Sequence, residues 1–271
     1  MLNKLFPPKK ITLPNGKIVL QNRSFIPFIV LFLVLCTLLS ANFTGFSFKV
    51  LIDRIDEFFI IVKAMIPPNW GYISKVWRPL LDTIKMSLLG SLLGALLALP
   101  IAVAAASNIT KSKVITVVSK TLLSILRTLP TLVTALIATF IFGLGPTAGA
   151  VAILLFTVSY VGKLLYEQIE TVDMGAFEAM QSIGMTRIQA FRYAVIPQVL
   201  PGYISTSLYC FEGNVRYAAI LGYVGAGGIG LLIQEGLGWR DYQAVGLLIL
   251  VLIITVYIIE RVSEHFRKKL I

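Results

Sequence analysis

Charged residues are scarce in this sequence, and so are the residue types that build catalytic and metal centres. Only 14% of the 271 residues are charged, whereas an ordinary soluble domain carries about a quarter. The single histidine, His265, lies in a basic tail. The two cysteines, Cys36 and Cys210, lie in apolar runs without the spacing of metal ligands. We therefore exclude an ordinary soluble domain and expect neither a metal site nor catalytic residues.

Long apolar runs are what the sequence has in abundance. Hydrophobic residues make up 57% of the chain, and the runs approach the about 20 residues that cross the hydrocarbon core of a bilayer as a helix. The predicted fold class is an all-α, polytopic transmembrane helical bundle with about six spans. The expected spans are Phe25–Ala41, Ile84–Ser107, residues 114–142 with a break at Pro130, the run from the Gly143–Pro146 turn to Tyr166, the run from Pro197 to Leu221, and Gln243–Glu260.

Small residues in the second expected span predict a close helix crossing. Gly90, Ser91, Gly94, Ala95 and Ala98 recur along this span, and small side chains allow neighbouring membrane helices to approach closely.

Lysine and arginine are unevenly distributed between the two sides of the predicted bundle. The loops and termini on one side carry 15 of them, and the opposite loops carry 6. Cytoplasmic loops hold the excess of positive charge in membrane proteins, so we expect both termini in the cytoplasm. This distribution also accounts for the net charge of +11, so we expect no nucleic-acid partner.

Four regions follow from this topology. Residues 1–24 are expected to be a cytoplasmic N-terminal arm, and residues 25–271 a transmembrane domain. Within that domain, residues 47–66 have apolar side chains at helical spacing opposite charged ones, which predicts an extracytoplasmic amphipathic helix. Residues 173–197 interrupt the apolar runs on the cytoplasmic side, and we refer to them as the polar segment.

The polar segment predicts a helix, a tight turn and a second helix. Asp173 can cap the first helix, and Gly184 stands where a left-handed turn would end it. Residues 186–189 have the spacing of a capping box at the start of the second helix. An apolar stripe is expected from Phe177, Met180, Ile188 and Phe191. By pattern alone, an ordinary connecting loop with amphipathic helices remains an alternative.

The polar segment resembles the EAA loop of binding-protein-dependent ABC importers, which docks on a partner ATPase and transmits its movement. The resemblance rests on Glu178, Ala179, Gly184, Ile196 and Pro197, with Met180 and Ala194 as departures. It is closer to the permeases of phosphonate importers. The matching stretches are Pro67–Trp70, Leu81–Ile84, Leu99–Asn108, Arg127–Pro130, Gly143–Pro146, Val161–Leu164, Phe211–Arg216 and Gly225–Gly230.

The resemblance implies a permease subunit with the type I importer fold and no enzymatic activity. It implies a homodimer, two ATP-binding cassette subunits that bind the ATP and magnesium, and an extracytoplasmic substrate-binding protein in a bacterial inner membrane. This chain would bind no cofactor. The alternatives are a permease of the same kind for another small solute (phosphite, a phosphate ester or methionine) and a self-gated channel. The implied ATPase-coupling residues are Glu178, Ala179, Gln181, Ser182, Gly184, Met185, Arg187 and Pro197.

Ionisable residues inside the fifth expected span form a second candidate site. Glu212 and Arg216 are spaced i, i+4, with Asn214 between them. Charges inside a membrane are costly, and they face a cavity or pair with each other. Two interpretations stay open: a self-neutralising structural pair, or an Arg216 that lines a translocation path for an anion.

The glycine-rich stretch at residues 225–230 fits the dinucleotide-binding pattern G-x-G-x-x-G but lacks its context. That pattern acts between a strand and a helix of a βαβ unit, and here it lies between two apolar runs. No Walker lysine follows a glycine loop, so ATP hydrolysis must belong to another chain. We expect either a flexible loop or tight helix crossing, or a gate or binding-protein docking loop built on Gly225, Gly227, Gly228 and Gly230.

Overall fold

The computed structural model describes residues 9–12, 18–21 and 25–270, in two compact units. The first unit ends at Ile60, and it holds strands β1 (Lys9–Thr12) and β2 (Ile18–Gln21), which pair antiparallel with Lys9 opposite Gln21. The rest of the expected arm lies outside the described residues. Helix α2 (Ile26–Phe43) is the first expected span, and none of its residues is buried within this chain.

The expected amphipathic helix at residues 47–66 consists of two helices, α3 (Phe48–Asp53) and α4 (Ile55–Ala64). The hydroxyl of Ser47 accepts a hydrogen bond from the backbone N–H of Val50 (3.5 Å) and caps α3. Arg54 separates the two helices, at φ −108° and ψ 7°.

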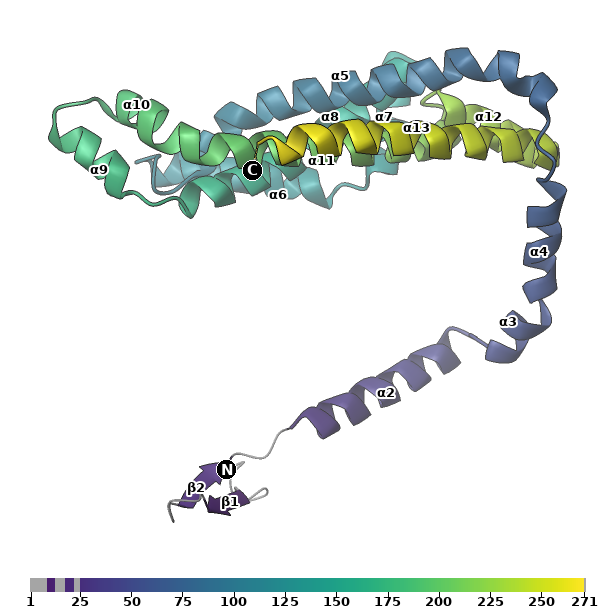
Figure 1. Ribbon diagram of the computed structural model, residues 1–271, viewed down its shortest axis with the longest axis horizontal. Coiled ribbons are helices and arrows are strands. Elements are labelled where there is room, and N and C mark those ends of the chain that lie inside the picture. The colour runs from purple at the N-terminus through teal and green to yellow at the C-terminus, as the bar shows by residue number, and fades with distance from the viewer. Residues whose placement is uncertain (1–8, 13–17, 22–24, 271) are drawn as a thin grey trace. The chain divides into compact units, whose positions relative to one another are not determined.

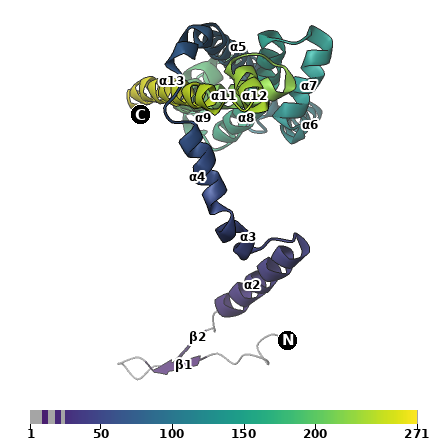
Figure 2. The same cartoon turned by 90° about the vertical axis from the view of Figure 1, so that its right-hand side faces the viewer.

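The second unit is a bundle of long helices (Figures 1 and 2). Helix α5 follows a 3-10 turn at Trp70–Tyr72, and a second 3-10 turn at Gly222–Val224 separates α11 from α12. The helices are α5 (Ile73–Ala105), α6 (Lys113–Thr128), α7 (Thr131–Phe142), α8 (Pro146–Glu170), α9 (Gly175–Ser182), α10 (Arg187–Ala190), α11 (Ile196–Leu221), α12 (Ile229–Gly238) and α13 (Tyr242–Lys268).

The number of membrane-crossing helices agrees with the prediction of about six. Among the described residues, four helices are long and apolar enough to cross a membrane, and two bent pairs bring the number to as many as six. The pair α6–α7 bends by 91° at the predicted break, where Pro130 has an extended backbone and precedes the first residue of α7. Proline lacks the backbone N–H that would continue α6.

Several elements differ from the expected boundaries. Helix α5 begins at Ile73 rather than Ile84, α8 ends at Glu170 rather than Tyr166, and α13 ends at Lys268 rather than Glu260. These helices extend beyond their apolar stretches, because polar residues continue a helix as well as apolar ones do. Helix α12 was not predicted, because its short apolar run follows a glycine-rich stretch that indicated a loop.

Helices α5 and α8 pack closely along their length, as the small residues of α5 predict. A Cβ atom built on Gly90 would lie 2.7 Å from the carbonyl oxygen of Ala150, and one on Gly94 would lie 2.6 Å from the Cβ of Thr157. Only glycine fits at these two crossings. The close contact makes α5 and α8 the centre of the bundle, against which α6, α7 and α11 pack.

Candidate functional site

The polar segment has the helix–turn–helix structure expected from its sequence. The carboxylate of Asp173 accepts a hydrogen bond from the backbone N–H of Gly175 (2.9 Å) just before α9. Gly184 has a φ of +91°, the left-handed conformation that ends many helices. Its N–H donates to the carbonyl of Gln181 (3.0 Å), and the N–H of Met185 donates to that of Met180 (3.2 Å). The turn is therefore fixed by backbone hydrogen bonds.

The second helix of the segment starts with the predicted capping box. The backbone N–H of Thr186 donates to the side-chain oxygen of Gln189 (3.0 Å), and the N–H of Gln189 donates to the hydroxyl of Thr186 (3.4 Å). Helix α10 then passes through a single π-helical stretch, Phe191–Val195, directly into α11. The chain from α10 to α11 is therefore helical without a break.

Phe177 and Ile188, two of the four residues in the predicted apolar stripe, differ in how far their side chains are buried. Phe177 is buried in a cluster that includes Ile169 and Val195, and it fixes α9 on the bundle. Ile188, however, is 81% exposed, so the predicted apolar stripe is not buried along its whole length. Ile183 is also exposed, at 75%. The turn between α9 and α10 thus presents two large apolar side chains at the surface.

Most of the predicted coupling residues lie around this turn and are accessible. Pro197 is apart from the rest, because it lies in the first turn of α11 beyond the π-helical stretch. The exposed residues are Glu178, Ala179, Ser182, Gly184 and Pro197, and the half-buried ones are Gln181, Met185 and Arg187. Figure 1 shows α9 and α10 projecting together beyond one end of the long helices.

Arg187 joins the polar segment to the loop between α5 and α6. Its guanidinium donates to the carbonyl of Ile109 (2.7 Å) and lies over the ring of Phe177. The amide of Asn108, in the same loop, donates to the carbonyl of Ile169 (2.7 Å) near the end of α8. The α5–α6 loop therefore holds both the end of α8 and the start of α10.

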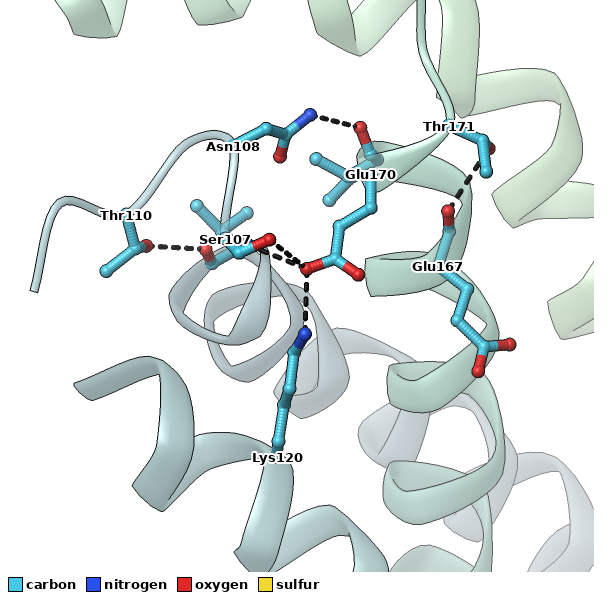
Figure 3. Close-up of polar contacts among 9 residues, drawn as sticks. Ser107, Asn108, Thr110, Lys120, Glu167, Glu170 and Thr171 are labelled. Carbon is cyan, nitrogen blue, oxygen red and sulfur yellow. Dashed lines mark hydrogen bonds and ion pairs between the residues drawn. The ribbon is translucent and has the colours of Figure 1, made fainter. Parts of the chain in front are cut away.

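A polar cluster beside this loop fixes the end of α8 (Figure 3). One carboxylate oxygen of Glu170 accepts hydrogen bonds from the backbone N–H (2.8 Å) and the hydroxyl (2.7 Å) of Ser107. The same oxygen accepts a third from the ammonium group of Lys120 on α6 (2.8 Å). This cluster was not predicted, because residues 50 and 63 positions apart in the sequence carry no local signal of pairing.

The second candidate site contains an unexpected third charge. The predicted pair is present, with 3.2 Å between an Arg216 guanidinium nitrogen and a Glu212 oxygen. The other Glu212 oxygen lies 3.4 Å from a guanidinium nitrogen of Arg267 on α13. The Glu212 side chain is only 5% exposed, against 54% for Arg216 and 25% for Arg267. Arg267 was not among the residues predicted for this site.

Asn214 lies apart from these charges, in the packing of α11 against α5 and α8. It is 1% exposed, and its amide donates to the hydroxyls of Ser91 (2.8 Å) and Thr157 (2.9 Å). These contacts set the register of α11 against both helices. Among the three residues proposed for this site, only Arg216 reaches a pocket, which has a volume of about 370 Å³ and lies along α8 and α11.

The glycine stretch is packed against the bundle. Gly225, Gly227 and Gly228 have φ values of +78°, +72° and +72°. Gly227, Gly228 and Gly230 are buried, and a Cβ on Gly228 would lie 2.5 Å from the hydroxyl of Thr83. That hydroxyl accepts a hydrogen bond from the backbone N–H of Ile229 (2.8 Å). The burial favours the tight helix crossing among the interpretations of this stretch.

The sequence of the chain is similar to those of known proteins. A family model described as "Binding-protein-dependent transport system inner membrane component" matches residues 90–270. The chain is 36% identical over 206 residues to the phosphite transport system permease protein PtxC of Stutzerimonas stutzeri, covering 76% of this chain and 74% of that protein. It is 31% identical over 212 residues to the phosphate-import permease protein PhnE of Mycolicibacterium smegmatis, covering 78% of this chain and 40% of that longer protein.

Solved structures support the same fold. A chain of the inward-facing MetNI methionine ABC transporter superimposes with a TM-score of 0.66 at 21% identity, covering 75% of this chain and 99% of that one. A chain of an amino acid ABC transporter gives a TM-score of 0.62 at 24% identity, covering 73% and 95%. With a family match over more than half of its length, the chain belongs to the binding-protein-dependent transport system inner-membrane components, as a multi-pass permease with the type I ABC importer fold.

Proposed function

We propose that this permease forms a solute path across the bacterial inner membrane and is driven by a separate ATPase that grips the turn between α9 and α10. The observation that carries the proposal is the exposed, firmly supported turn of the polar segment. Ile183 and Ile188 offer apolar contact area, and Glu178 offers a charge beside them. The backbone bonds of Gly184 and the Arg187 contact to Ile109 keep the turn in one conformation.

The path from the turn into the bundle supports an ATP-driven cycle. Closure of an ATPase pair would move α9 and α10, and α10 continues through the π-helical stretch into α11. The contacts of the α5–α6 loop would pass the same movement to α8. A rigid displacement of packed helices of this kind is a common means of switching between two states.

The proposed assembly contains two copies of this chain, two ATP-binding cassette subunits and an extracytoplasmic substrate-binding protein. ATP and magnesium would bind to the ATPase subunits, and this chain would hold no cofactor and carry out no covalent chemistry. The distribution of positive charge supports an orientation with both termini and the polar segment in the cytoplasm.

For the cargo, we propose a phosphonate, a choice supported by a relative named for cryptic phosphonate transport. Phosphite is the first alternative, because other relatives are named for phosphite and phosphate transport. A further alternative is another small solute carried by the same machinery, since relatives named for D-methionine and carnitine transport also match. A ligand screen on the partner binding protein separates these cases: tight binding of methionine or carnitine without phosphonate or phosphite would contradict our assignment.

Site-directed cross-linking tests the coupling and the orientation together. In a background without Cys36 and Cys210, Ser182→Cys places a thiol on the exposed surface of α9, and Trp239→Cys places one beyond α12, at a residue that is 86% exposed. We expect Ser182→Cys to cross-link to the ATPase and to react with an impermeant maleimide only after permeabilisation. Trp239→Cys should react in spheroplasts whose inner membrane is intact, and it should not cross-link. The reverse pattern would refute the orientation.

A further inference from the structure

The pocket along α8 and α11 has an aromatic lining and a cationic group. Its volume of about 370 Å³ lies near the lower end of the ~300–1,000 Å³ range of small-molecule sites. Phe156 and Tyr160 are stacked with ring centroids 5.7 Å apart, and Phe156 meets Tyr217 edge to face. Tyr209 and Arg216 also line the pocket. Among the described lining residues, Arg216 alone carries a charge.

The ion pairs around Glu212 leave positive charge at this pocket. Glu212 is a single carboxylate that contacts two guanidinium groups, so the cluster has a net charge of +1. The two partners also differ in burial, because Glu212 is 5% exposed and Arg216 is 54% exposed. Arg267 supplies the second contact to the carboxylate, and it does not line the pocket. The side chain of Arg216 is thus available to a ligand while Glu212 is not.

We propose that this pocket is a subsite for a small oxyanion on the transport path, in which Arg216 binds the anion and the tyrosines orient it. A guanidinium presents parallel N–H donors that match two oxygens of a phosphorus oxyanion. The hydroxyls of Tyr160, Tyr209 and Tyr217 add O–H donors. An aromatic lining alone would also suit a quaternary ammonium group, but the positive charge of Arg216 repels a cation. The inference rests on the proposed function and adds a binding group within the membrane domain.

A direct binding measurement tests the subsite without relying on transport. The probe is methylphosphonate, added to the assembled permease–ATPase complex in nanodiscs without binding protein, and the readout is broadening of its phosphorus NMR line. We expect broadening with the wild-type complex and a loss of apparent affinity of about 10-fold or more in Arg216→Gln, because the charge-assisted contact is removed. Arg216→Lys should restore part of it. Choline, the cationic control, contains no phosphorus and is tested by competition: an excess of it should not reverse the broadening of the methylphosphonate line.

Arg267→Gln is the matched control, because it removes a guanidinium from the same carboxylate outside the pocket. Binding should persist in this variant. Equal loss in Arg267→Gln and Arg216→Gln would mean that the pair is structural and would overturn the subsite, as would wild-type binding by Arg216→Gln or competition by choline. If Arg216→Gln does not assemble, Tyr217→Phe keeps the ring and should weaken binding by about 3-fold or more through loss of one hydroxyl donor. Unchanged binding in that variant would also refute the proposal.

The subsite and the proposed function fail separately. The subsite alone is refuted if the wild-type complex drives ATP-dependent uptake but the broadening of the methylphosphonate line does not depend on Arg216. Arg216-dependent broadening in a complex that never couples ATP hydrolysis to uptake would leave the subsite and refute the proposed function.

Discussion

Gly184→Ala tests whether ATPase docking requires the left-handed turn of the polar segment. Gly184 has a φ of +91°, and no atom lies within 4 Å of the position that a new Cβ would occupy. The cost of alanine is therefore backbone strain alone, about 1–2 kcal/mol for a left-handed residue with a side chain. The chain can avoid this strain only by giving up the Gly184 and Met185 hydrogen bonds, which costs a similar amount at roughly 0.5–1.5 kcal/mol each.

We expect the free turn to relax in this variant, and docking then weakens because the docked state must restore the strained conformation. An energy of about 1–2 kcal/mol corresponds to a factor of roughly 5–30 in an equilibrium constant, so the affinity for the ATPase subunit should fall by about that factor if docking requires the observed turn. The assay is the dissociation constant of the ATPase for the permease in nanodiscs, with thermal unfolding recorded in parallel. Gly184→Asn should recover part of the affinity, because asparagine tolerates the left-handed conformation.

Gly143→Ala is the matched control. Gly143 has a φ of +82° and also has no atom within 4 Å of a new Cβ, but it follows α7 and lies outside the polar segment. Its ψ of 172° places it in a region that only glycine occupies readily, so it should lose at least as much stability while docking stays unchanged. Docking by Gly184→Ala at wild-type affinity, or an equal loss of docking in Gly143→Ala, would refute the reasoning.

Three further outcomes are expected. Ile188→Asp, at a side chain that is 81% exposed, should change the free energy of unfolding by less than about 0.5 kcal/mol and still abolish ATPase binding in a pull-down; retained binding would contradict the role of the apolar pair. Lys120→Met and Glu170→Gln, combined in a double-mutant cycle, should give an interaction energy of about 0.2–1 kcal/mol by thermal unfolding, since both side chains are partly exposed. Lys120→Met should also reduce the amount of solute taken up per ATP hydrolysed. An unchanged ratio of uptake to ATP hydrolysis would mean that the pair is only a structural contact. Gly94→Ala should destabilise the bundle by about 1–3 kcal/mol through its contact with Thr157, whereas Gly238→Ala, where a Cβ meets open space, should not; equal effects would contradict the close α5–α8 crossing.

Local sequence signals predicted those parts of the structure that local interactions determine. The break at Pro130 follows from a missing backbone donor, and the left-handed turn at Gly184 and the capping box at Thr186 follow from the chemistry of single residues and their near neighbours. The small residues Gly90 and Gly94 likewise signalled a close crossing, although not the helix that they meet.

The remaining features depend on contacts between distant parts of the chain. Glu170 with Lys120, and Glu212 with Arg267, are separated by 50 and 55 positions, and no periodicity links them. Ile188 was placed in the apolar stripe because its spacing suits a helix, but helical spacing does not say which face the bundle covers. Helix α12 escaped notice because it is short and follows three glycines with positive φ.

ATP-dependent uptake is the most direct measurement of the central claim, that a separate ATPase drives this permease through the turn between α9 and α10. Proteoliposomes would contain the permease with or without its ATPase, with ATP on the ATPase side and binding protein loaded with labelled methylphosphonate on the other. We expect uptake only when both ATP and the ATPase are present, and a strong reduction with Ile188→Asp. Uptake by the permease alone, or uptake that ignores ATP, would contradict the account and favour a self-gated channel.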